Sequence, residues 1–210
     1  MKFILAKKIE MSQRFKPNGT VVPVTLLEAG PCVITQIKTK EKDGYDAVQI
    51  GFETKKNPNK PELGHTKGLE KAFVVLKEFR LDAPATQAVG DVIDASTFAT
   101  GDFVEAQGVS KGKGFQGVVK RHGFRGGPAS HGHKDNLRMP GSIGAGGIQK
   151  VFKGMRMGGR MGTDVVTVKN LEIVEVDAAK GIIAIKGAVP GARGAEITLI
   201  GGHTEKLSWN

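Results

Sequence analysis

Residues 108–162 read GVSKGKGFQGVVKRHGFRGGPASHGHKDNLRMPGSIGAGGIQKVFKGMRMGGRMG, and the rest of the chain is organised around this stretch. It holds eleven Lys and Arg, three His and sixteen of the 30 glycines, against a single acid, Asp135. The whole chain has 31 basic and 21 acidic residues, so the residues outside the stretch carry 20 of each. The entire net charge of +10 therefore lies in this one segment.

The composition of this basic stretch predicts that it does not fold alone. Its few apolar residues follow no helix or strand period and cannot offset the entropy lost on ordering so many glycines. A long basic segment with almost no acids needs a polyanion to order it, and nucleic acid is the commonest one. The alternative, a solvated loop without a partner, fits the near absence of acids less well.

On both sides of the basic stretch the sequence has the pattern of short β-strands. Runs rich in β-branched residues, separated by turn residues, predict strands at 3–9, 21–29, 32–39, 45–52, 90–93, 103–107, 165–169, 171–176, 182–186 and 196–200. Leu69, Ala72, Phe73 and Leu76 have helical spacing and predict one amphipathic helix over about 66–78. We therefore expect a mainly β protein, a small closed β-barrel formed by residues 1–107 and 163–210, with 108–162 inserted as a basic extension.

Several classes of protein are disfavoured. Cys32 is the only cysteine, which excludes an internal disulfide and predicts a buried apolar side chain in a reducing compartment. The N-terminal residues lack the apolar run of a signal peptide, and no run approaches the ~18 residues of a membrane span. We expect a soluble, cytoplasmic protein.

Three specific kinds of site are also weighed and rejected. His122, His131 and His133 suggest a metal, but only one carboxylate and no cysteine lie near them to complete the ligands. The glycines at 108–114 resemble a phosphate-binding loop but do not have its G-x4-G-K-[ST] spacing. Nor do nucleophile and base residues form a catalytic arrangement. The prediction is no enzyme, no cofactor and no metal.

The remaining interpretation is an RNA-binding segment. Its cations neutralise phosphates, its glycines allow close approach of the backbone, and its Phe and His side chains, including Phe124, stack on unpaired bases. The residues predicted to bind RNA are Lys111, Lys113, Phe115, Lys120, Arg121, His122, Arg125, His131, His133, Lys134, Arg138, Lys150, Phe152, Lys153, Arg156 and Arg160.

Seven motifs are spread over essentially the whole chain: VPVT (22–25), EAGPC (28–32), DGYDAVQIGF (43–52), SKGKGFQG (110–117), PGSIG (140–144), VFKG (151–154) and KGAVPG (186–191). In these motifs and in their order the chain resembles a known family, the bacterial form of large-subunit ribosomal protein L3. The chain departs from some members at Ala145, where they carry a methylated glutamine, and this modification is not carried over.

The resemblance implies a translation-protein-type barrel at the surface of the large subunit. It further implies an extension that runs through large-subunit (23S-type) ribosomal RNA toward the peptidyl transferase centre, binding early in subunit assembly, and contacts between the barrel and neighbouring ribosomal proteins. Composition alone leaves two alternatives open. One is a free RNA chaperone or DNA-architectural protein, and the other is an enzyme that uses the barrel as a substrate module.

Overall fold

A computed structural model of the chain describes residues 2–69 and 71–201. These residues form two compact units. The first, here called the barrel unit, runs up to Val109 and resumes at Val165; the second, here called the extension, is Ser110–Asp164. No helix among the described residues is long and apolar enough to cross a membrane.

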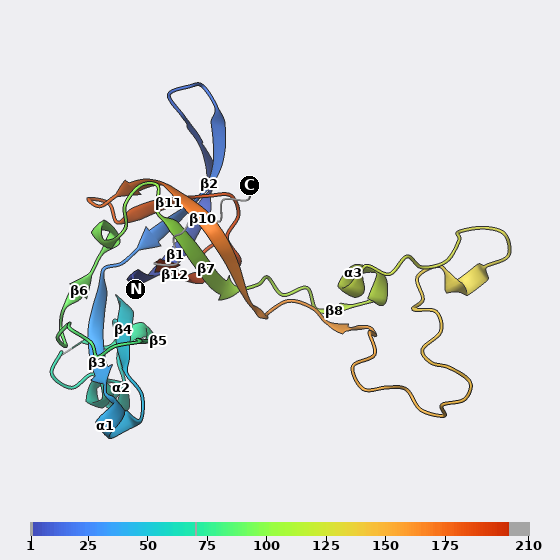
Figure 1. Ribbon diagram of the computed structural model, residues 1–210, viewed down its shortest axis with the longest axis horizontal. Helices are drawn as coiled ribbons and strands as arrows, with labels where there is room; N and C mark the ends of the chain where they lie inside the picture. The colour runs from blue at the N-terminus through green and yellow to red at the C-terminus, as the bar shows by residue number, and fades with distance from the viewer. Residues whose placement is uncertain (1, 70, 202–210) are drawn as a thin grey trace. The chain divides into compact units, whose positions relative to one another are not determined.

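Six antiparallel strands close a barrel in the first unit (Figure 1). They are β1 Lys2–Phe15, β2 Val21–Ala29, β7 Phe103–Val109, β10 Val165–Asp177, β11 Ile182–Lys186 and β12 Glu196–Gly201. Their order around the barrel is β1-β12-β7-β10-β11-β2, and pairing of β2 with β1 completes the ring. The predicted fold class, mainly β with a small closed barrel, is confirmed.

The barrel core consists of aliphatic side chains from alternate strand positions. Ile183 and Ile185 on β11 are fully buried, and so are Ile197 and Leu199 on β12. Residues two apart on a strand point to the same face, so each strand presents its apolar residues inward. Burying one such side chain contributes about 1.5–3 kcal/mol, which makes this core the main source of the barrel's stability.

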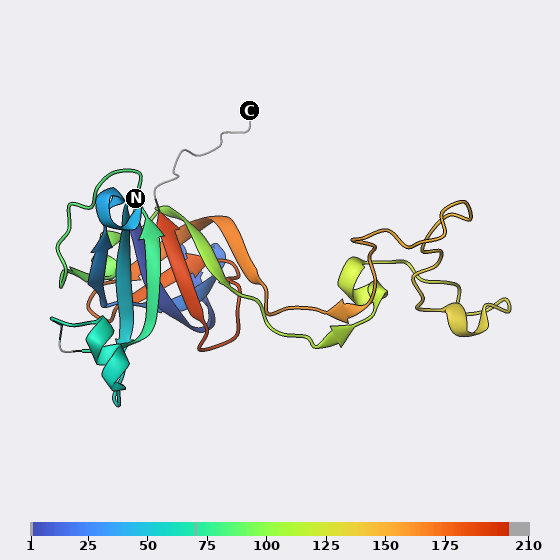
Figure 2. The same ribbon diagram turned by 90° about the horizontal axis from the view of Figure 1, so that it is seen from below.

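A second sheet in the same unit has the order β5-β4-β3-β6. Its strands are β3 Cys32–Lys38, β4 Ala47–Thr54, β5 Phe73–Arg80 and β6 Val92–Ile93. Figure 2 shows its blue-green strands beside the orange and red strands of the barrel. The ring of Phe3 on β1 stacks on Phe79 on β5 with centroids 4.3 Å apart, so the two sheets share one core.

The predicted helix over about 66–78 is wrong. Residues Phe73–Arg80 form strand β5, paired with β4, and the structure of Glu70 lies outside the described residues. Phe73 is buried whereas Leu76 is 39% exposed, so the two do not share the apolar face that helical spacing had assigned to them. The β-branched Val74 and Val75 and the pairing along β4 outweigh a helical period of only four residues.

Short helices occur elsewhere in the barrel unit. They are α1 Lys40–Asp43, α2 Lys60–His65 and the 3-10 turn η1 Ala95–Thr97. Helix α2 begins in a segment rich in Pro and Asn, residues that interrupt the strand pattern of the sequence. Asn59 is its N-cap and Pro61 lies in its first turn, and the Glu62 carboxylate accepts a hydrogen bond of 2.8 Å from the Asn59 backbone N–H. Both residue types are favoured at a helix start.

Two further sequence predictions concern β10 and Cys32. The strands predicted at 165–169 and 171–176 are one strand, β10, whose pairing with β7 shifts register between Val168 and Leu171. Asn170 takes a φ of 57° at this irregularity, a backbone conformation that Asn tolerates. Cys32 is fully buried, as predicted, and burial raises the pKa of its thiol to about 11.

The extension contains little regular structure. Its elements are β8 Phe115–Gln116, α3 Val118–His122, the 3-10 turn η2 Lys134–Asn136 and β9 Gly159–Arg160. Helix α3 is flanked by Gly117 and by Gly123, whose φ of 70° ends it. Val118 is the buried apolar residue that the extension contributes to the described core residues.

Candidate nucleic-acid interface

The two ends of the extension run antiparallel and are joined by backbone hydrogen bonds. The Ser110 N–H donates to the Asp164 carbonyl over 2.9 Å, and the Lys113 N–H donates to the Met161 carbonyl over 2.9 Å. The short strands β8 and β9 continue this ribbon. Gly162 has a φ of 81°, and a Cβ on it would lie 2.1 Å from the Lys111 carbonyl oxygen, so only glycine fits there. The ribbon thus brings predicted RNA-binding residues from both ends of the segment together.

Helix α3 positions two more of the predicted residues against the returning arm. The Arg121 guanidinium donates from Nη1 to the Met157 carbonyl over 2.9 Å, and His122 Nε2 lies 3.0 Å from the same oxygen. Gly159 permits this approach, because a Cβ there would lie 2.7 Å from Arg121 Nη1. A guanidinium has five N–H donors, so Arg121 keeps donors for a phosphate while it bridges the two arms.

The cations of the basic stretch are exposed and have no acidic partners among residues 2–69 and 71–201. Each of its eleven Lys and Arg side chains is exposed, and none takes part in an ion pair with any described residue. All ten ion pairs of the described chain lie in the barrel unit. The positive charge of the extension therefore remains available for an anion, whereas much of the barrel's charge is matched locally.

The aromatic and imidazole residues differ in exposure. Phe115 is 79% exposed and Phe152 is 53% exposed, so both rings offer faces for stacking. His131 is exposed, while His122 and His133 are partly buried. Of the sixteen residues predicted to bind RNA, these two histidines are the ones that the extension itself partly covers. The RNA-binding role of all sixteen stays a prediction.

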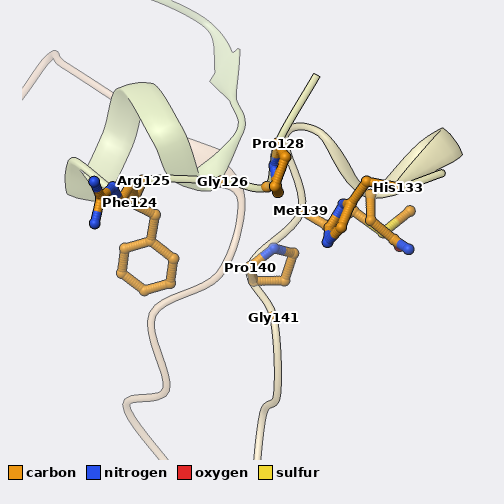
Figure 3. A pocket seen from close by; sticks show the side chains of 10 residues that line it. Phe124, Arg125, Gly126, Pro128, His133, Met139, Pro140 and Gly141 are labelled. Carbon is orange, nitrogen blue, oxygen red and sulfur yellow. The ribbon is translucent and has the colours of Figure 1, made fainter. Parts of the chain in front are cut away.

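A cavity of about 780 Å³ lies within the extension (Figure 3). We call it the 124–141 pocket; it is lined by Phe124, Arg125, Gly126, Gly127, Pro128, His133, Asn136, Met139, Pro140 and Gly141. Sequence reasoning named Phe124, Arg125 and His133 but not the other seven lining residues. Six of the seven lie in the Gly-Gly-Pro at 126–128 and the Met-Pro-Gly at 139–141, which indicate turns rather than a site, and Pro140 and Gly141 also begin the PGSIG motif; Asn136 had no signal.

The three histidines of the extension do not form a metal site in the part of the chain that the structure describes. Among those residues no group of three or more His, Cys, Asp or Glu side chains is arranged to hold a metal ion. His122 instead contacts the Met157 carbonyl, and its ring lies 6.0 Å from that of Phe124.

Comparison with known proteins adds an independent finding. Residues 78–205 match the family model described as Ribosomal protein L3. The large ribosomal subunit protein uL3 of Roseiflexus sp. strain RS-1 is 51% identical over 193 residues, which cover 90% of this chain and 92% of that protein. The uL3 of Pelotomaculum thermopropionicum is 49% identical over 201 residues, covering 94% and 95%. That of Heliobacterium modesticaldum is 50% identical over 195 residues, covering 91% and 92%.

Proposed function

The chain belongs to the ribosomal protein L3 family, and on that premise we propose that its extension binds large-subunit ribosomal RNA. Membership makes the protein a structural constituent of the large ribosomal subunit. The proposal concerns what the extension does there: it is the part of the protein that enters the RNA, while the barrel unit holds both of its ends.

The observation that carries the proposal is the set of eleven exposed cations without ion-pair partners among the described residues. A protein cation that neutralises an RNA phosphate releases a condensed counterion, and this release drives binding. An intramolecular ion pair would oppose that gain, because it would have to be broken first. Cations without such partners contribute the whole free energy of counterion release to RNA binding.

The anchoring of the extension supports a directed role rather than loose contact. Its ends continue from two neighbouring strands of the barrel, where Val109 on β7 pairs with Val165 on β10. Fixing both ends lowers the entropy that the segment has left to lose when it becomes ordered on RNA.

The resemblance noted in the sequence suggests where the extension goes. We propose that it runs toward the peptidyl transferase centre, that it helps to nucleate subunit assembly, and that the barrel unit contacts neighbouring ribosomal proteins. In this account the protein performs no catalysis of its own, because its role is that of a structural constituent of the large subunit.

Co-sedimentation with large subunits tests this function against that of a free RNA chaperone. The full chain is expected to remain with the subunit after washing at high salt, because it is built into the particle. A variant in which a short linker replaces Ser110–Asp164 is expected to be lost under the same conditions. If the full chain washed off, the protein would not be built into the particle; if the variant were retained equally well, the extension would not be the RNA-binding element.

A further inference from the structure

We propose that the 124–141 pocket receives a single unpaired RNA base that is extruded from its helix. This inference rests on the proposed RNA-binding function and adds to it the chemical group that one part of the extension recognises. It turns a segment that attracts phosphates without regard to sequence into one that also recognises a particular structural feature of the RNA.

The lining of the pocket favours a partly apolar ligand with a face for stacking. Its volume of about 780 Å³ lies in the range of small-molecule sites, roughly 300–1,000 Å³. Phe124, Met139 and Pro140 contribute apolar surface, and Figure 3 shows the Phe124 ring and the Pro140 ring on the two segments that border the cavity. Unpaired bases are recognised by stacking on aromatic rings such as that of Phe124.

One wall of the pocket is a close crossing of two backbones that requires glycine. The Gly127 N–H donates to the Leu137 carbonyl over 2.9 Å. Gly126 has a φ of 75°, and a Cβ on it would lie 2.3 Å from the same carbonyl oxygen. A Cβ on Gly127 would lie 2.3 Å from Cε1 of the His133 ring. The two glycines therefore let the imidazole and the backbone at Leu137 pack directly against the chain.

The pocket also holds a polar atom without a partner. Nδ1 of His133 is buried and makes no hydrogen bond with any described residue. A buried polar group left unpaired costs roughly 1–3 kcal/mol, so a ligand that satisfies it gains affinity. The edge of a nucleobase carries both donors and acceptors, so it can pair with this nitrogen once the imidazole turns it from Gly127 toward the pocket.

The positive charge around the pocket suits the RNA phosphates on either side of an extruded base. Arg125 lines the pocket and is exposed. Lys134 and Arg138 are exposed and lie next in sequence to the lining residues His133 and Met139. Asp135 is the only acid of the segment 108–162, so the three cations outnumber the acidic residues near them in sequence. A phosphate on each side of the base would find a positive partner.

Chemical probing of the complex between the full chain and large-subunit RNA tests this proposal. Base-specific reagents report whether an unpaired base is covered, and hydroxyl radicals report protection of the RNA backbone. The wild-type chain is expected to protect at least one unpaired base within the backbone footprint of the extension.

Two variants remove the ring or the space without changing the charge. Phe124→Leu keeps apolar bulk but removes the stacking face, and Gly127→Ala places a methyl group where the His133 ring now lies. Both are expected to restore reactivity of that base and to weaken binding. For a lost stack the loss is about 5- to 150-fold, with an unchanged dependence on salt. Ile148→Ala is the matched control, because Ile148 is an apolar residue of the extension, 43% exposed, that lies outside the pocket.

The outcomes separate this inference from the function on which it rests. If the backbone footprint is present but no unpaired base is covered, or if both pocket variants bind and protect like Ile148→Ala, the base-binding pocket is refuted and RNA binding stands. If the wild-type chain leaves no backbone footprint through its extension, the proposed function fails as well. Retention of the barrel's thermal transition in each variant shows that the barrel unit has folded, and an unchanged backbone footprint shows that the extension still lies on the RNA.

Discussion

Replacing the extension with a tight turn is expected to stabilise the barrel unit. The strands that flank the extension already pair at Val109 and Val165, and facing Cα atoms of antiparallel strands are only ~4.5–5.5 Å apart. A two-residue Asn-Gly linker, which favours the type I′ hairpin turn, can therefore join them directly. The deletion of Ser110–Asp164 removes none of the residues that fill the barrel core.

The size of the effect follows from the entropy of closing the loop. The extension is a loop of 55 residues, and the cost of closing a flexible loop grows as (3/2)RT ln n. Shortening it to two residues lowers this cost by about 3 kcal/mol, and an eight-residue Gly/Ser linker lowers it by about 1.7 kcal/mol. At ~2–4 °C per kcal/mol, the melting temperature rises by about 6–12 °C for the short linker.

Circular dichroism of the free proteins during heating measures both variants against the full chain. The account predicts one cooperative transition in each, at temperatures that rise as the linker shortens. A non-cooperative transition, or a melting temperature below that of the full chain, would show that the extension stabilises the barrel and would refute its description as a separate unit.

Substitutions at Gly51 and Glu78 test the packing and the charges of the β5 sheet, and Gly64→Ala in α2 is the control for the first. A Cβ on Gly51 would lie 2.4 Å from the Phe73 ring, so Gly51→Ala should destabilise the protein by about 1–3 kcal/mol in urea unfolding. Gly64→Ala in α2, where a Cβ meets nothing within 4 Å, should instead stabilise it by ~0.4–1 kcal/mol; equal effects of the two substitutions would contradict the contact with Phe73. Lys38 Nζ lies 2.6 Å from Glu78 Oε1, and this partner holds the pKa of the Glu78 carboxyl below its usual value. The ion pair stabilises the fold at any pH above ~4.3, the pKa of a Glu carboxyl in the unfolded chain. This stabilisation is lost as the pH falls through the lower pKa that Glu78 has in the folded protein. Glu78→Gln should therefore lower the melting temperature at neutral pH but not in acid, and a deficit that persists in acid would refute this assignment.

Much of the barrel could be predicted from the sequence because its strands have strong local signals. The bounds predicted for β2 and β11, 21–29 and 182–186, are those of the structure. Both are runs rich in β-branched residues with turn residues at their ends. The helix predicted over 66–78 is wrong because the apolar spacing of this segment fits a helix locally. Pairing with β4, which is distant in sequence, decides its structure instead.

The candidate interface, too, could be predicted only in part from the sequence. The cations of the extension are visible in the composition, because a segment with eleven bases and one acid stands out in any fold. The 124–141 pocket is not visible, because it depends on the Gly127–Leu137 hydrogen bond and on the packing of His133 against a glycine. Contacts of this kind join residues of irregular backbone and leave no periodic pattern in the sequence.

The central claim, that the extension binds RNA through its phosphates, is tested most directly by the salt dependence of binding. Affinity of the full chain for large-subunit RNA should fall with salt at a slope of about −0.7 to −0.9 per neutralised phosphate. The extension variant replaces Lys150, Lys153 and Arg156 together by Ala. The control makes the same change of charge in the barrel unit, at three exposed lysines near α1 and α2: Lys42, Lys60 and Lys67.

The extension variant should flatten the slope of log Kobs against log salt by about two to three units, because it removes three phosphate contacts. The control should leave the slope unchanged. A slope that stays the same in the extension variant, or that flattens equally in the control, would contradict the claim that the exposed cations of the extension hold the RNA.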